Sequence, residues 1–153
     1  MEKKETINPD TNIGYLLTQV SFMKQRIINA ALTELDITYV QFIILAGTLE
    51  LGENGNIVTQ QDISSERRLD KAMVSNVVKT LIKKDLIIRK KHPVDKRAYT
   101  LQLTKEGELT AIKGKEIARK IDARFFESID KKSFMESLIN LLTNNSKIYG
   151  NPE

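Results

Sequence analysis

The sequence predicts a mainly α-helical protein of the α+β class, on three observations. Apolar residues recur at helical spacing over long stretches near both ends of the chain. Shorter helical patterns lie between these stretches, and each follows a residue that caps helices. One stretch, Tyr99 to Leu103, alternates apolar and polar residues as a half-buried strand does. With 153 residues, 41% of them hydrophobic, the chain is long enough to bury a core.

In the N-terminal part, the apolar spacing predicts a helix from Ile13 to Leu35, which is long for a globular protein. Thr38 and Gln41 have the spacing of a capping box, which opens a second helix. That helix is expected to end near Gly52. A turn follows, and then a short apolar pair, Ile57-Val58, which we interpret as a stub of strand.

Two shorter helices are predicted in the middle of the chain. Thr59 and Asp62 form a capping pattern that opens the first of them, which ends near Glu66. Asp70 is the expected N-cap of the second, which continues to about Lys84.

A hairpin is predicted after these helices. Its first strand begins at Ile87-Ile88 and its second is Tyr99 to Leu103, while Pro93 and Asp95 mark the turn between them. Roughly eight turn residues separate the strands, so the hairpin has a long tip.

The C-terminal part is predicted to be helical again. Thr104 caps a long helix whose apolar residues form one stripe: Leu109, Ile112, Ile117, Ile121 and Phe125. Asp130 or Ser133 opens a last helix. The polar tail from Asn144 to Glu153 is expected to fray.

The composition excludes several classes of function. The chain has no cysteine, which excludes disulfides, thiolate metal sites and cysteine nucleophiles, and His92 is its single histidine. A glycine-rich phosphate loop and a nucleophile motif are also missing, so we expect no enzyme activity, cofactor or metal. The N-terminus lacks a signal-peptide pattern, and the longest apolar run, Phe42 to Ala46, is too short to cross a bilayer. We therefore expect a cytoplasmic protein without a membrane partner.

The positive charge is concentrated in the middle of the chain. The net charge is only +4, but residues 59–107 hold twelve cationic and six anionic side chains, whereas the remainder carries a net charge of −2. Such a basic stretch is typical of a protein that binds a polyanion. A solvated basic face without a partner is the alternative.

Two helices followed by a hairpin form a winged helix-turn-helix, in which the second helix enters the major groove of DNA. Projection of the helix after Asp70 predicts an inner face of Met73, Val74, Val77, Val78, Leu81 and Ile82. The predicted outer face consists of Ala72, Ser75, Asn76, Lys79 and Lys83. Short side chains allow close approach to base edges, and Asn76 can bind adenine. An ordinary amphipathic helix with a solvated outer face would show the same pattern.

The hairpin carries cations at its edges and tip. Its first strand holds Arg89, Lys90 and Lys91, and its tip holds Asp95, Lys96 and Arg97. A cationic tip can enter a minor groove, where narrow A·T tracts concentrate negative potential. Asp95 fits there as a turn residue that positions Arg97. A turn with a local ion pair and no DNA contact remains the alternative.

The sequence resembles the MarR family of bacterial transcription regulators over nearly the whole chain. The most specific match is a run in the hairpin and just after it: Asp95, Lys96, Arg97, Leu101, Leu103, Thr104 and Gly107. The stretch from Val74 to Leu81 resembles the recognition helix of the family, and Lys84 to Ile87 resembles the exit into the wing. Asp85 stands where the family usually has glycine.

The resemblance implies a homodimeric DNA-binding regulator, with repression favoured over activation, on pseudo-palindromic double-stranded DNA. It implies that Arg97 enters the minor groove with Asp95 as its orienting partner. By resemblance, four residues match base-facing positions: Ala72, Ser75, Asn76 and Lys79. From the residue pattern itself, Lys83 suits phosphate or guanine, and Lys96 belongs to the cationic tip. Thr59 and Gln60 open a helix whose N-terminus can meet phosphate. Without cysteine, the chain does not fit the thiol-based peroxide sensors of the family. A winged-helix module that binds RNA or protein remains the alternative function.

The long terminal helices have apolar stripes that a winged domain alone cannot cover. We therefore expect residues 1–36 and 105–153 to form a helical dimerisation region and residues 37–104 to form the DNA-binding domain; a monomeric helical cap is the alternative. Members of the family that the sequence resembles often bind small aromatic or phenolic compounds in a cleft between these regions. Tyr15, Met23, Tyr39 and Phe42 could line such a cleft, or could be ordinary core residues.

Overall fold

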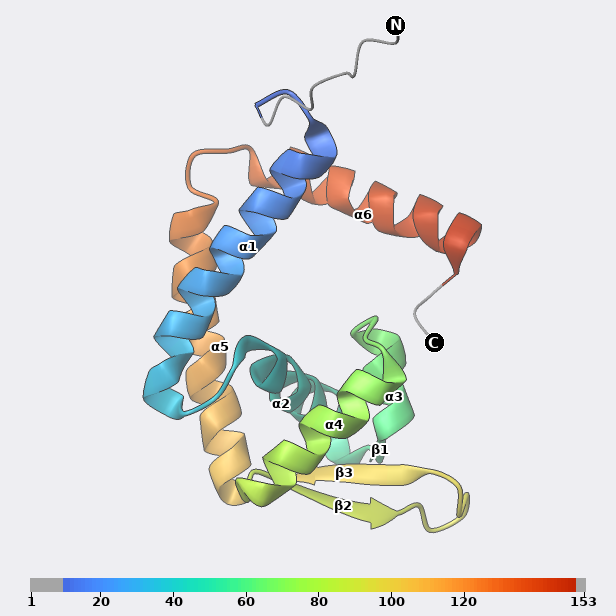
Figure 1. The fold of residues 1–153 in the computed structure, drawn as a ribbon. Coiled ribbons are helices and arrows are strands. Elements are labelled where there is room, and N and C mark those ends of the chain that lie inside the picture. The colour runs from blue at the N-terminus through green and yellow to red at the C-terminus, as the bar shows by residue number, and fades with distance from the viewer. Residues whose placement is uncertain (1–9, 151–153) are drawn as a thin grey trace, which may run out of the picture.

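The computed structural model describes residues 10–150 and has the predicted mainly α-helical, α+β architecture (Figure 1). Its six α-helices are α1 (Ile13–Leu32), α2 (Tyr39–Leu51), α3 (Gln60–Glu66), α4 (Lys71–Lys83), α5 (Lys105–Phe125) and α6 (Lys131–Tyr149). Its three strands are β1 (Val58–Thr59), β2 (Ile87–Lys91) and β3 (Tyr99–Leu103). Two short 3₁₀ turns, Thr33–Leu35 and Glu53–Gly55, follow α1 and α2.

The helices begin where the capping residues predict. The side chains of Thr38, Thr59, Asp70 and Thr104 each accept a hydrogen bond from the backbone N–H three residues further on. The first two are complete capping boxes. Asp130, and not Ser133, caps α6 by accepting from the N–H of Ser133 at 3.2 Å. Each cap satisfies a donor that would otherwise lack a partner, which is worth about 1 kcal/mol.

The three strands form one antiparallel sheet in the order β1-β3-β2. The hairpin of β2 and β3 pairs Ile87 with Leu103 at its base and Lys91 with Tyr99 at its far end. Ile87 and Leu101 are buried, whereas the far end is exposed. The base of the hairpin is thus anchored in the core while its tip extends into solvent, as a wing does (Figure 1).

The core lies between α2, α3, α4 and the sheet. Ile44, Leu45, Ile63, Val78 and Leu81 are completely buried there. Seven residues of α2 are buried, which makes it the central helix against which α4 packs. Complete burial of a side chain of this size stabilises the fold by about 1.5–3 kcal/mol, so the orientation of α4 is strongly determined.

The predicted apolar stripe of α5 is wrong in its first half. Leu109 and Ile112 are 44% and 50% exposed. The buried face of α5 consists of small residues instead: Gly107, Thr110, Ala111 and Gly114. A Cβ atom on Gly107 would lie 1.9 Å from the carbonyl oxygen of Leu86. The small residues let α5 approach residues 37–104, here called the winged unit, closely. This approach turns Leu109 and Ile112 of α5 outward. Ile117 and Ile121 do pack against the core.

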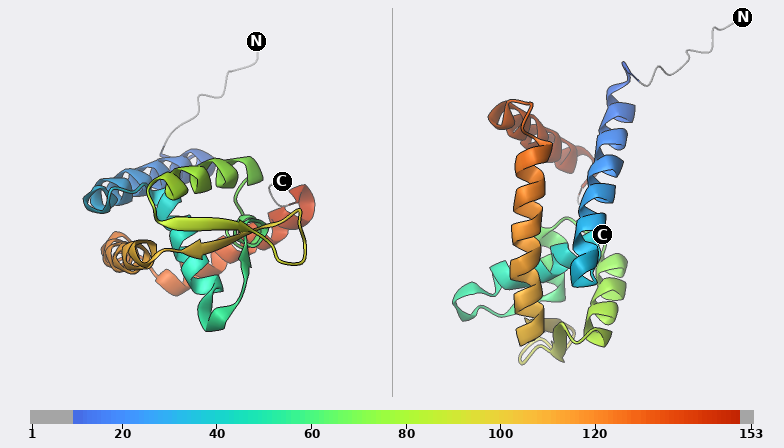
Figure 2. Two further views of the ribbon diagram at one scale, coloured as in Figure 1. Left: turned by 90° about the horizontal axis from the view of Figure 1, so that it is seen from below. Right: turned by 90° about the vertical axis from the view of Figure 1, so that its left-hand side faces the viewer.

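The helices α1 and α5 lie side by side and rise away from the sheet, as the two views of Figure 2 show. At their far end, α6 crosses over and turns back (Figure 1). The helix α6 continues to Tyr149, so the prediction of fraying from Asn144 is wrong up to that residue, and residues 151–153 lie outside the described part. In residues 10–150, no single helix is both long and apolar enough to span a membrane; by length and composition, only residues 13–35 and 39–51 taken together would be, and a 71° bend separates them.

Candidate nucleic-acid interface

The helix α4 presents the predicted outer face to solvent. Ala72, Asn76, Lys79 and Lys83 are exposed, and Ser75 is half-buried. On the opposite side Val74, Val78 and Leu81 are completely buried, with Met73 and Val77 half-buried. The assignment of Ile82 to the inner face is wrong, because this side chain is 36% exposed at the edge of the helix. The arrangement leaves a short polar surface followed by two lysines.

A tight turn joins α3 to α4. Arg68 has a φ of 53°, in the left-handed region, and the N–H of Leu69 donates to the carbonyl of Ser64 at 2.9 Å. The two helices pack directly on each other in a helix-turn-helix. Thr59 and Gln60 lie where α3 begins: the hydroxyl of Thr59 is used for capping, and the buried Oε1 of Gln60 has no hydrogen-bond partner.

The wing tip presents a cation held by a carboxylate. Arg97 donates its backbone N–H to Oδ1 of Asp95 at 3.1 Å, and its guanidinium Nε lies 3.5 Å from the same oxygen. The Arg97 side chain is 94% exposed, and Lys96 beside it is exposed as well. The predicted pairing of Asp95 with Arg97 is therefore present. It positions the arginine without covering it.

The wing holds two further contacts that the sequence interpretation missed. The guanidinium carbon of Arg89 lies 4.6 Å from the ring centroid of Tyr99, a cation–π contact. Since Lys91 pairs with Tyr99, Arg89 sits diagonally opposite the ring on the same face, which a register prediction could have found. The second is made by His92, the single histidine, which is half-buried and whose ring accepts hydrogen bonds from the backbone of the tip.

The turn from α4 into β2 forms despite the absence of the usual glycine. Asp85 has a φ of 59°, a left-handed conformation that glycine adopts freely and that aspartate tolerates better than most residues. Its carbonyl accepts a hydrogen bond from the hydroxyl of Thr104 at 2.7 Å. The departure at Asp85 therefore leaves the exit into the wing intact.

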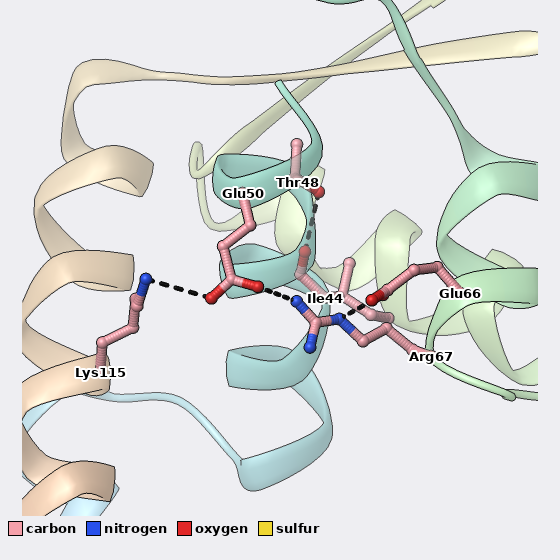
Figure 3. Close-up of polar contacts among 6 residues, drawn as sticks. All are labelled: Ile44, Thr48, Glu50, Glu66, Arg67 and Lys115. Atoms are coloured by element: carbon pink, nitrogen blue, oxygen red, sulfur yellow. Dashed lines mark hydrogen bonds and ion pairs between the residues drawn. The ribbon is translucent and has the colours of Figure 1, made fainter. Parts of the chain in front are cut away.

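A network of ion pairs ties the winged unit to α5 (Figure 3). The carboxylate of Glu50, on α2, pairs with Arg67 after α3 and with Lys115 on α5, the latter at 3.1 Å. Arg67 also pairs with Glu66 at 2.8 Å. Partial burial acts to raise the pKa of Glu50, but the hydrogen bonds and charges of Lys115 and Arg67 outweigh it and hold that pKa below its ordinary value.

The four residues considered for an effector site do not form one group. Tyr39 and Phe42 stack with ring centroids 6.3 Å apart, and Phe42 is buried against Gly114. Tyr15 and Met23 are exposed on α1, separated by about 12 Å of helix. Two hollows of about 610 and 550 Å3, one beside β3 and one between α1 and α5, are lined by other residues. Within residues 10–150, no group of three or more acidic or histidine side chains could hold a metal.

Comparison with known proteins identifies relatives that are helix-turn-helix regulators, as the geometry of this interface indicates. A family model described as the MarR family matches residues 35–98. A relative from Bacillus subtilis (strain 168), the uncharacterized HTH-type transcriptional regulator YdcH, is 40% identical over 135 residues, which cover 88% of this chain and 92% of the relative.

Two solved structures share the fold. The S. aureus MepR–DNA complex has a TM-score of 0.76 at 21% identity, covering 92% of this chain and 99% of that one. Bordetella bronchiseptica BpsR, whose DNA binding is regulated by 6-hydroxynicotinic acid, has a TM-score of 0.76 at 20% identity, covering 92% and 97%. With its capped helix-turn-helix, its cationic wing and these relatives, the chain belongs to the MarR family and is a winged helix-turn-helix transcriptional regulator, not an enzyme.

Proposed function

We propose that the chain acts as a homodimeric repressor on pseudo-palindromic double-stranded DNA, in the cytoplasm. The observation that carries this proposal is the exposed Arg97 held by Asp95 on a wing that extends beside α4. A guanidinium in this position suits a narrow minor groove, while an exposed polar helix face suits the adjacent major groove. The S. aureus relative was solved bound to DNA, which supports this assignment.

The side chains divide by the part of DNA that each would contact. Ala72, Ser75 and Asn76 lie near the start of α4, where a recognition helix meets base edges. Lys79 and Lys83 lie further along and would contact phosphates or guanine. Thr59, Gln60 and Lys96 would add contacts to the backbone.

Dimerisation would cover apolar surface that one chain leaves open. The helix α1 exposes Ile13, Leu16, Leu17, Val20, Phe22, Met23 and Ile27, and α6 exposes Met135, Ile139, Leu141, Leu142 and Ile148. Apolar surface on this scale in a regulator marks a protein contact, and a two-fold assembly matches a palindromic site. We assign dimerisation to residues 1–36 and 105–153, of which 1–9 and 151–153 lie outside the described part, and DNA binding to residues 37–104.

A small aromatic effector would act by binding the two DNA-affinity states differently. The regulation of BpsR by 6-hydroxynicotinic acid supports this class of effector. Of the four residues considered, Tyr39 is the best placed, because it is half-buried where α1 meets α2 and Lys24 lies 5.3 Å from the centroid of its ring. A shift in melting temperature with aromatic acids would identify a ligand that favours the folded state.

The test is DNA binding by fluorescence anisotropy, with duplex from the promoter region of the protein's own gene. If six to ten phosphates are contacted, affinity falls by roughly 10³-fold or more between about 50 and 200 mM salt. Arg97→Ala weakens binding most at sites with A·T-rich flanks, whereas Lys132→Ala, which removes the same charge from α6, does not. A response that is flat with salt, or equal affinity for any RNA, would favour the alternative of an RNA- or protein-binding module.

A further inference from the structure

The tip of the wing is organised around the imidazole of His92. Nδ1 of this ring accepts hydrogen bonds from the backbone N–H groups of Val94 and Asp95, at 3.1 and 3.0 Å. His92 is half-buried, whereas every residue from Pro93 to Arg97 is exposed. The ring therefore lies on the inside of the turn and its neighbours lie around it.

This pattern is the one that an asparagine or aspartate makes in an Asx turn. There a side-chain acceptor one bond beyond Cγ binds the N–H groups two and three residues further on. In histidine, Nδ1 occupies the same position relative to Cβ. A ring nitrogen that accepts two hydrogen bonds carries no hydrogen of its own, so the other nitrogen, Nε2, holds the proton of the ring.

Asp95 links this turn to the exposed cation. Its N–H is held by His92, its carbonyl accepts from the N–H of Ala98 at 3.0 Å, and its carboxylate accepts from the N–H of Arg97 at 3.1 Å. The N–H of His92 in turn donates to the carbonyl of Ala98 at 2.9 Å, which closes the tip. All three polar groups of Asp95 are thus engaged, and its carboxylate has a fixed direction.

We propose that His92 is a positioning residue for DNA binding: by holding the backbone of Asp95, it sets the direction in which Asp95 presents Arg97 to the minor groove. This inference rests on the proposed function, since it assumes that Arg97 contacts DNA. It goes beyond that function by assigning the conformation of the wing tip to a half-buried side chain on the inside of the turn. Without His92, Arg97 keeps its charge but samples more directions, and it loses more conformational freedom on binding.

Three variants of His92 test whether the tip depends on the position of the hydrogen-bond acceptor or on the size of the side chain. His92→Asn places an amide oxygen where Nδ1 lies and keeps both hydrogen bonds. His92→Gln keeps a polar side chain of similar size but moves its acceptor one bond further out, and His92→Ala removes it. Hydrogen–deuterium exchange of the Val94 and Asp95 amides, measured by NMR without DNA, is faster in the Gln and Ala variants and close to wild type in the Asn variant.

Binding to duplex with A·T-rich flanks then tests the link to Arg97. We expect His92→Gln and His92→Ala to weaken binding by about tenfold, as the loss of one to two hydrogen bonds predicts, and His92→Asn to bind as the wild type does. In an Arg97→Ala background, His92→Gln has no further effect. Matched melting temperatures show that each variant is folded.

Two results would overturn the inference while leaving the proposed function in place. One is that His92→Asn weakens binding as much as His92→Gln. The other is that His92→Gln weakens the Arg97→Ala chain as much as it weakens the wild type. If Arg97→Ala itself binds A·T-flanked duplex as tightly as wild type, the minor-groove role fails and the inference fails with it.

Discussion

The winged unit, residues 37–104, buries its apolar residues within the chain, whereas two of the long helices around it, α1 and α6, leave most of theirs exposed. In the winged unit, α2 is enclosed on several sides and α4 buries a complete face. Along its described length α6 buries no residue, and α1 buries only Ile28 and Leu32. Within one chain the winged unit therefore buries most of its apolar residues, whereas α1 and α6 leave apolar surface open that the proposed dimer would cover.

Substitutions in the two regions are therefore expected to act on different processes, folding in one and assembly in the other. The direction of α4 depends on packing within the chain, so substitutions there act on folding first. In the proposed dimer, the exposed faces of α1 and α6 would be covered by association, so substitutions there are expected to act on assembly first. The following predictions test this division, from the largest expected effect to the smallest.

The largest effect is expected at the centre of the winged unit. Ile44→Ala removes a completely buried side chain from α2 and leaves a cavity, so the free energy of unfolding falls by about 2–5 kcal/mol. Urea denaturation at a fixed protein concentration measures this loss. Ile139→Ala on α6, where the side chain is 60% exposed, is the control and changes the intrachain packing little. Equal losses in the two variants would contradict the division.

The next effect is expected where α5 meets α2. A Cβ atom on Gly114 would lie 2.6 Å from the ring of Phe42, so Gly114→Ala forces the two helices apart and costs about 1–3 kcal/mol. Gly14→Ala is the matched control on α1, where the nearest atom is 3.5 Å away; alanine there favours the helix and stabilises it by up to about 1 kcal/mol. Thermal unfolding distinguishes the two signs, and stabilisation by Gly114→Ala would show that α5 does not depend on this close approach.

A change on the outer face of α4 is expected to spare the fold. Asn76→Ala leaves the melting temperature close to wild type, because the side chain is exposed. It relaxes the base preference at one position of each half-site, at a cost of about 1–3 kcal/mol, which binding to a set of singly substituted duplexes measures. A uniform loss over all duplexes would assign Asn76 to the DNA backbone.

The smallest effect is expected at the link between the two regions. Because the folded-state pKa of Glu50 is lowered, its stabilising contribution is present above its unfolded pKa near 4.5 and is lost as pH falls through the lower folded value. Glu50→Gln therefore destabilises the chain at neutral pH, by about 0.5 kcal/mol for a partly exposed ion pair near the surface, and less in acid. Urea denaturation at several pH values checks this, and a difference that grows in acid would contradict it.

Most of the fold was predictable from local signals. The caps at Thr38, Thr59, Asp70 and Thr104 place helix starts because they depend on neighbouring backbone groups alone. The stripe of α5 was not predictable in this way. Its inner face depends on how closely Leu86 and Phe42 approach Gly107 and Gly114, which is a tertiary property.

The candidate interface was predictable for similar reasons. The outer face of α4 follows from helical periodicity, and the pairing of Asp95 with Arg97 follows from turn chemistry. The role of His92 in the tip did not follow, because an Asx-like turn made by an imidazole has no common sequence signal. The contact of Arg89 with Tyr99 required the strand register, which the sequence pattern left undetermined.

The central claim is that two chains, joined through their long helices, bind one duplex through two winged units. Sedimentation velocity of the chain with a duplex from its promoter region tests this most directly, alone and with Ile139→Glu in α6. The account predicts two chains per duplex for the wild type, and for Ile139→Glu a free monomer with greatly weakened binding. A single wild-type chain bound per duplex, with an affinity unchanged by Ile139→Glu, would contradict it.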